Sequence, residues 1–172
     1  MATKRDIETY KKMTRAERRV AICKDVIQQL DAGRYIASST YLELANAGDE
    51  LVETKDNPIS DKTCYLCGKG AMFVSKVSKF NGVKPFVPDD TCESDMISGV
   101  SDAFSENQMD IIEELFECYA SFRDLVGNDK DDQLKWRQNS KDERLRIICQ
   151  NIIDNKGTLK PKQLRDYEVE EI

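Results

Sequence analysis

The sequence predicts a mainly α-helical, compact domain, and two observations carry this prediction. In three places that precede an apolar helical pattern, Ser or Thr stands three residues before Glu or Gln, the pattern of a capping box at a helix start. The three pairs are Thr14 and Glu17, Ser105 and Gln108, and Ser140 and Glu143. The second observation is a balance of 40% hydrophobic and 34% charged residues in 172, which is typical of a folded domain. We expect five or six helices, and a short β-hairpin would fit beside them.

The first half of the chain begins with a basic, flexible lead-in over residues 1–13. A helix follows Thr14, with Cys23 and Ile27 on its apolar face and Gly33 as its stop. Residues 35–44 alternate weakly and favour a short extended segment or hairpin, and 46–62 read as a loop. The pattern of 66–80 predicts a helix whose small residues would allow close contact with other helices.

In the second half, a weak pattern predicts a short helix over residues 94–104. Helices then follow Ser105 and Ser140, and Gly157 would end the second of them. Between these helices, 127–139 reads as a polar linker. We expect one domain over 14–158, packed around the helix of 66–80, and a charged, mobile tail over 159–172.

The absence of histidine removes the usual general base and every imidazole metal ligand. The sequence also shows no Gly-rich loop of the kind that binds phosphates. We therefore do not expect an enzyme. No apolar run approaches the roughly 20 residues needed to span a membrane, and the basic start lacks the apolar stretch of a signal peptide. We therefore expect a cytoplasmic protein with reduced cysteines.

Cys64 and Cys67 form the sharpest local motif, because two thiolates at this spacing can bind one zinc ion. They resemble half of a zinc ribbon, and no second C-x-x-C completes it. We prefer the interpretation that both are small apolar residues near a buried helix. A zinc-binding nucleic-acid module remains an alternative, although the acidic pI of about 4.9 disfavours direct nucleic-acid binding.

Four carboxylates and one aromatic residue are candidates for partner contact. Asp110, Glu113, Glu114 and Glu117 recur at helical spacing, which predicts an acidic side of the helix opposite its apolar stripe. That side either contacts a basic partner or is simply solvated. Trp136, next to Arg137, is either a partner anchor or a lid over the core.

A basic cluster offers a different alternative, binding of a nucleotide signal. Arg15, Arg18, Arg19 and Lys69 are the residues that would contact its phosphates.

Three blocks of the chain resemble uncharacterised small proteins of bacteriophages and mobile elements. They are 20–35, 64–77, and 104–116 joined to 143–158, about a third of the chain, and the strings 142–145 and 151–158 are the most distinctive. The resemblance brings no catalytic residues with it. It implies a phage context, and so a non-enzymatic protein that docks on a host protein of a defence system and inhibits or modulates it. If one helix face is apolar and exposed, we also expect the chain to form a homodimer.

Overall fold

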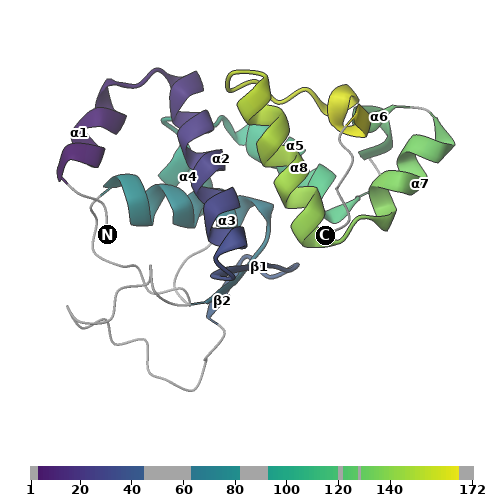
Figure 1. Cartoon of the computed structure of the whole chain (residues 1–172), viewed down its shortest axis with the longest axis horizontal. Coiled ribbons are helices and arrows are strands. Elements are labelled where there is room, and N and C mark those ends of the chain that lie inside the picture. The colour runs from purple at the N-terminus through teal and green to yellow at the C-terminus, as the bar shows by residue number, and fades with distance from the viewer. Residues whose placement is uncertain (1–3, 45–62, 82–92, 120–121, 128, 167–172) are drawn as a thin grey trace.

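The computed structural model describes residues 4–44, 63–81, 93–119, 122–127 and 129–166 (Figure 1). The α-helices are α1 (Lys4–Lys12), α2 (Arg15–Asp31), α3 (Gly68–Lys76), α4 (Glu93–Val100), α5 (Glu106–Glu117), α6 (Phe122–Val126), α7 (Lys130–Gln138) and α8 (Lys141–Asp154). A π-helical turn, η2 (Val77–Asn81), continues α3, and a 3-10 helix, η4 (Pro161–Asp166), follows α8. The strands are β1 (Tyr35–Ala37), β2 (Leu42–Leu44) and β3 (Cys64–Leu66). The mainly α prediction is confirmed.

All three predicted capping boxes are present, at the starts of α2, α5 and α8. At the first of them, the Thr14 backbone N–H donates to Glu17 Oε2 over 2.8 Å, and the Glu17 N–H donates back to Thr14 Oγ1 over 3.3 Å. Each box satisfies N–H groups that the first turn of a helix leaves without an intrahelical acceptor. These helix starts were predictable because the bonds are local in sequence.

Helix α3 is the centre of the fold, and every residue of it is buried. Helices α2, α4 and α5 pack around it, whereas α8 packs mainly on α2 and α5. Its small residues allow this closeness: a Cβ added to Gly68 would lie 3.1 Å from Ile112 Cγ2 on α5. A Cβ added to Gly70 would lie only 1.8 Å from the Tyr41 carbonyl oxygen. The predicted role of the small residues is confirmed.

The strands form a small mixed sheet in the order β1-β3-β2. Strand β3 pairs parallel to β1 and antiparallel to β2, so β1 and β2 do not pair with each other. The expected extended segment in 35–44 is therefore present, but a hairpin within it is wrong. The reason is that β3, whose Cys64 and Leu66 are both buried, inserts between the two strands just before the chain enters α3.

Three segments expected to be irregular are helical and packed. In α1, buried Tyr10 stacks on Phe80 with ring centroids 4.6 Å apart, so the flexible lead-in is wrong over 4–12. The supposed linker of 127–139 contains α7. In the supposed tail, η4 buries Leu164 and packs on α6 and α7. The predicted loop at 46–62 and the end of the tail from 167 onward lie outside the described residues.

Candidate functional site

The acidic side of α5 meets the N-terminal turn of α3, and this junction is the candidate functional site. Glu113 of α5 is buried there, and its Oε2 accepts the backbone N–H of Lys69 over 3.3 Å. The first turn of α3 leaves such N–H groups without an intrahelical acceptor, and the helix dipole favours an anion at this end. A carboxylate predicted to face solvent therefore acts as part of the cap of a central helix.

Cys67 is the N-cap residue of α3, and its Sγ accepts the Gly70 N–H over 3.4 Å. Its thiol also forms a hydrogen bond with the Glu113 carboxylate. Burial, with a further contribution from the negative charge of Glu113, raises the pKa of the Cys67 thiol to about 12. Burial likewise raises the pKa of Glu113. The thiol is thus neutral at physiological pH, which makes Cys67 a structural cap rather than a reactive thiolate.

Lys69 and Asp110 form an ion pair across the same junction, with Lys69 Nζ 2.9 Å from Asp110 Oδ1. The Lys69 side chain is only 5% exposed, whereas that of Asp110 is 54% exposed. The buried ammonium is therefore neutralised by a carboxylate at the protein surface. Lys69 stabilises the junction of α3 and α5, and this ion pair takes the place of the phosphate contact considered from the sequence.

Glu117, one turn beyond Glu113, lies in a third set of contacts. Its Oε2 lies 2.7 Å from Lys141 Nζ at the start of α8 and accepts a hydrogen bond from Ser39 Oγ over 3.0 Å. The Glu117 side chain is 8% exposed, and its Oε1 has no hydrogen-bond donor among the described residues. The sequence pattern singled out neither Ser39 nor Lys141, because both reach Glu117 from distant parts of the chain.

The carboxylates of α5 are thus divided between two directions. The prediction that all four share a solvent-facing side is wrong for Glu113 and Glu117, which are enclosed by α3, α8 and the segment after β1. The outward row is Glu106, Asp110 and Glu114, spaced four residues apart; Glu106 and Asp110 are exposed and Glu114 is half-buried. Glu106 was missed, although its position four residues before Asp110 places it on this row.

Two exposed tyrosines lie near the junction of α3 and α5. Cys118 adopts a left-handed conformation with φ 58° and ends α5, and Tyr119 follows with 53% of its surface exposed. Desolvation, and then the negative charges of Glu117 and Glu113, raise the pKa of Tyr119. Tyr41, 42% exposed, has its carbonyl against Gly70 of α3. We call Glu106, Asp110, Glu114, Tyr119 and Tyr41 the α5 surface.

Trp136 is not an exposed anchor. It lies on α7 and is 3% exposed, and its Nε1 donates to the Leu115 carbonyl over 3.0 Å. A buried indole needs such an acceptor for its N–H, and the last turns of α5 provide one. The Arg137 side chain is exposed and its guanidinium lies over the Phe122 ring, 4.9 Å from the centroid. The interpretation of Trp136 as a lid over the core is confirmed.

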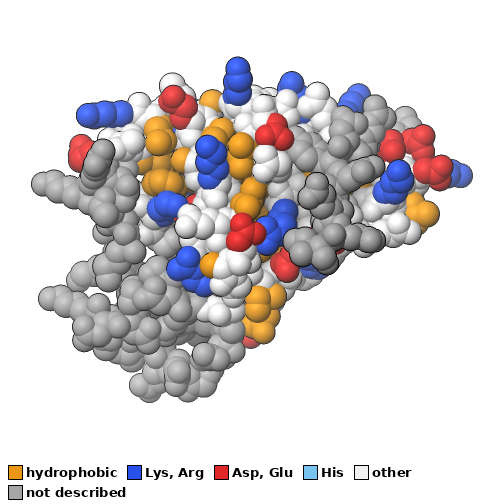
Figure 2. Space-filling model, in the orientation of Figure 1, with side chains coloured by type: hydrophobic (Ala, Val, Ile, Leu, Met, Phe, Trp, Pro, Cys, Tyr) orange, Lys and Arg blue, Asp and Glu red, His pale blue; other side chains and the backbone are white. Residues whose placement is uncertain are grey.

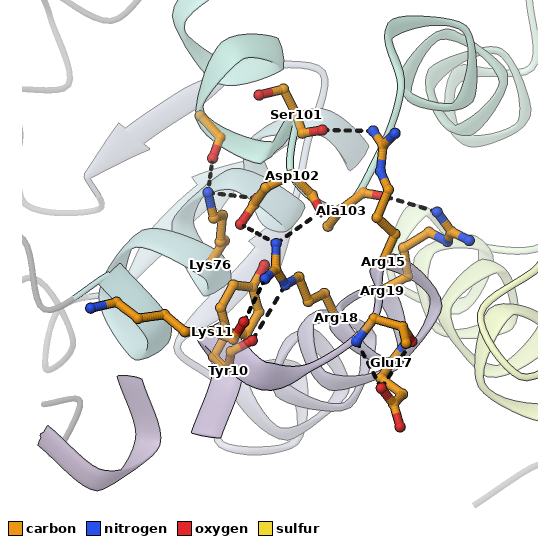
Figure 3. A network of polar contacts seen from close by, with 12 residues as sticks. Tyr10, Lys11, Arg15, Glu17, Arg18, Arg19, Lys76, Ser101, Asp102 and Ala103 are labelled. Atoms are coloured by element: carbon orange, nitrogen blue, oxygen red, sulfur yellow. Dashed lines mark hydrogen bonds and ion pairs between the residues drawn. The ribbon is translucent and has the colours of Figure 1, made fainter. Parts of the chain in front are cut away.

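The three arginines of α2 hold the end of α4 (Figure 3). Arg15 donates to the Ser101 carbonyl over 2.7 Å, and Arg19 donates to the Ala103 carbonyl over 2.8 Å. These carbonyls belong to the turn that follows α4, so the two arginines fix this turn against α2.

Asp102 lies at the centre of this network. Its Oδ2 is 3.3 Å from Arg18 NH1, and its Oδ1 is 2.8 Å from Lys76 Nζ, as Figure 3 shows. On the face seen in Figure 2, basic side chains are scattered rather than gathered. The arginines considered for nucleotide binding thus contact 101–103, whereas Lys69 contacts α5, so the four do not converge on one site.

The last candidate from the sequence is the zinc motif of Cys64 and Cys67. Cys64 is buried in β3, and among the described residues no group of three or more Cys, Asp or Glu side chains is arranged to hold a metal ion. Within the same part of the chain, no helix has the length and apolar character needed to cross a membrane. No family model matches the chain, and no curated protein or solved structure is significantly similar to it.

Proposed function

We propose that this chain is a non-enzymatic binding protein that docks on a host protein of a defence system, and inhibits or modulates it, through the α5 surface. One observation carries the choice of surface. Tyr119 and Tyr41 are two of the three large hydrophobic residues that are clearly exposed among the described residues. Tyr119 directly follows the end of α5, and the Tyr41 carbonyl lies against Gly70 in the first turn of α3. Tyrosine is enriched in protein interfaces because its ring buries much area at low entropic cost and its hydroxyl forms hydrogen bonds.

The contacts beneath this surface also support a binding role. The capping of α3 by Cys67 and Glu113, and the ion pair of Glu117 with Lys141, fix α5 against α3 and α8. A surface held by buried contacts loses little conformational freedom when a partner binds, which favours affinity. The assignment to a phage, to a defence target and to the host cytoplasm rests on the resemblance of the strings at 142–145 and 151–158.

The nucleotide-binding alternative has less support. Its three arginines already donate to the end of α4, and a ligand phosphate would have to displace those bonds. The zinc alternative would require Cys67, a buried helix cap, to lose its proton and leave α3.

An affinity pull-down from bacterial lysate tests the proposed function. The tagged wild-type chain is compared with Tyr119→Ala and with Asp131→Lys, a control at an exposed position of α7. We expect a stoichiometric host protein with the wild type and the control, and its loss with Tyr119→Ala. Circular dichroism confirms that each variant is folded. A nucleotide released on denaturation without any bound protein would contradict the proposal and support the ligand-binding alternative.

A further inference from the structure

We infer that Cys23 of α2 and Cys149 of α8 form a redox-sensitive pair, which closes to a disulfide when a low-molecular-weight disulfide oxidises the chain. The inference concerns the interior of the fold and does not rest on the proposed function. Two features of the structure support it. The packing of α2 on α8 places both cysteines at one interface, and their thiols are hydrogen-bonded to each other there.

Helices α2 and α8 lie side by side and run in opposite directions (Figure 1). At one end of the pair, Arg146 in the first half of α8 forms an ion pair with Asp31, the last residue of α2. At the other end, Arg19 in the first half of α2 donates through Nε to the Gly157 carbonyl, just beyond the end of α8, over 2.5 Å. These two contacts fix the register of the helices, so the middle turns of α2 and α8 face each other.

Cys23 and Cys149 belong to these middle turns. Both side chains are 0% exposed, both thiols are free, and a hydrogen bond joins the Cys23 thiol to that of Cys149. A disulfide requires a sulfur–sulfur distance of about 2 Å, and sulfur atoms that already share a hydrogen bond need only a small further approach. The fold thus brings together two thiols that lie more than 100 residues apart in the chain.

The reaction is thiol–disulfide exchange with glutathione disulfide or another oxidant of that class. The thiolate of one cysteine attacks a sulfur of the oxidant, which releases one glutathione thiolate and leaves a mixed disulfide on the protein. The thiolate of the second cysteine then attacks the protein sulfur of this mixed disulfide, and the second glutathione thiolate leaves. The two protons that the cysteines lose are taken up by the two leaving thiolates. The chain is oxidised by two electrons, and the oxidant is reduced to two thiols.

Burial determines when the exchange begins and how it ends. Burial, with a further contribution from the hydrogen bond to Cys149, raises the pKa of the Cys23 thiol, so the closed fold holds little reactive thiolate. The first step therefore takes place in molecules in which α2 and α8 have separated locally. A bulky mixed disulfide does not fit an interface in which both side chains are fully buried, whereas a bond between the two cysteines does. Repacking of the helices thus favours the second step.

Equilibration in glutathione buffers tests this inference. The protein is incubated at increasing ratios of glutathione disulfide to glutathione, starting from both the reduced and the oxidised chain, and is quenched with acid. Mass spectrometry and mapping of peptic peptides identify the products. We expect one intramolecular disulfide between Cys23 and Cys149, reached from both directions, and a mixed disulfide at most on the half-buried Cys118. Urea below the unfolding transition should speed the approach to equilibrium. Mixed disulfides alone, or a disulfide between other cysteines, would overturn the inference.

Matched variants and a stability measurement complete the test. Cys118→Ser is the control and should retain the disulfide, whereas Cys149→Ala should lose it. If Cys149→Ala does not fold, peptide mapping of the wild type still decides the pairing.

The oxidised wild type should unfold at a urea midpoint about 1 M higher than the reduced protein, because the bond closes a long loop in the unfolded chain. An equal or lower midpoint would show that the folded interface does not hold the two sulfur atoms in a bonding geometry, and would also overturn the inference.

Discussion

Two charged clusters, one at the start of α3 and one in the turn after α4, both pair side chains with backbone groups, but they differ in what they leave at the surface. At the N-terminus of α3, Cys67 and the carboxylate of Glu113 satisfy free N–H groups. In the turn that follows α4, Arg15 and Arg19 donate to the carbonyls of Ser101 and Ala103. In each cluster, side chains therefore satisfy backbone groups that lie outside regular helix hydrogen bonding.

The difference lies in what each cluster leaves for a partner. In the α4 cluster each arginine donates to a backbone carbonyl or a carboxylate within the chain, so its polar groups are committed to holding α2 and α4 together. In the α5 cluster the enclosed carboxylates, Glu113 and Glu117, hold α5 against α3 and α8. The outward row, Tyr41 and Tyr119 lie on the surface. Variants in the α4 cluster should therefore alter stability alone, and outward variants in the α5 cluster should alter binding with a smaller effect on stability.

The largest expected effect on stability is that of Gly70→Ala, which disrupts the close contact between α3 and the Tyr41 carbonyl. The added Cβ would lie 1.8 Å from the Tyr41 carbonyl oxygen, which is backbone and cannot rotate away. We expect a loss of about 3 kcal/mol in the free energy of unfolding, at the upper end of overpacking costs. Urea denaturation measures it, and Gly33→Ala is the control, where an added Cβ meets nothing within 4 Å. Gly33→Ala therefore introduces only the backbone strain of an alanine at a φ of 65°. Equal losses would contradict the close contact at Gly70.

A matched pair of aspartates compares the two clusters directly. Asp102 and Asp110 each pair with a buried lysine, over 2.8 and 2.9 Å, but Asp102 also holds Arg18. We expect Asp102→Asn to cost about 2 kcal/mol, because a buried ammonium loses its partner and a network is broken. Asp110→Asn should cost about 1 kcal/mol or less, since its exposed carboxylate is screened by solvent.

Urea midpoints of the two variants, measured in the same buffer, decide this comparison. Capture of a host protein should be unchanged in Asp102→Asn. An equal cost at both positions would show that the ion pair of Asp102 with Arg18 contributes nothing to stability.

Glu113 allows a pH test of the enclosed carboxylates. Burial raises its pKa in the folded chain above the usual 4.5, so the folded state binds this proton more tightly than the unfolded state does. Stability therefore falls as pH rises through the interval between the unfolded and folded pKa values. Glu113→Gln removes this proton and should flatten that part of the profile. Urea midpoints from pH 4 to 8 measure it, and parallel profiles for the two proteins would contradict the shift.

The sequence predicted what depends on neighbours along the chain. The three capping boxes and the small residues of α3 were correct because a helix start or a close contact needs only a few local residues. The direction of Glu113 was not predictable, since helical spacing places it beside Asp110 but does not show that the N-terminus of α3 lies there. The order β1-β3-β2 likewise depends on a strand nearly 30 residues away along the chain. The acceptors of Arg15 and Arg19 are backbone carbonyls, which have no signature in side-chain patterns.

The smallest expected effect is that of Arg15→Ala. Its guanidinium donates to the Ser101 carbonyl over 2.7 Å, but this bond is exposed to water. The loss should be about 0.5–1 kcal/mol, the net value of one such hydrogen bond. Capture of a host protein should be unaffected, because this residue lies in the α4 cluster. A nucleotide-binding protein would behave differently, since loss of one phosphate-contacting arginine weakens the ligand while stability barely changes. Thermal shifts of wild type and Arg15→Ala with a nucleotide panel thus separate a structural arginine from a ligand-binding one.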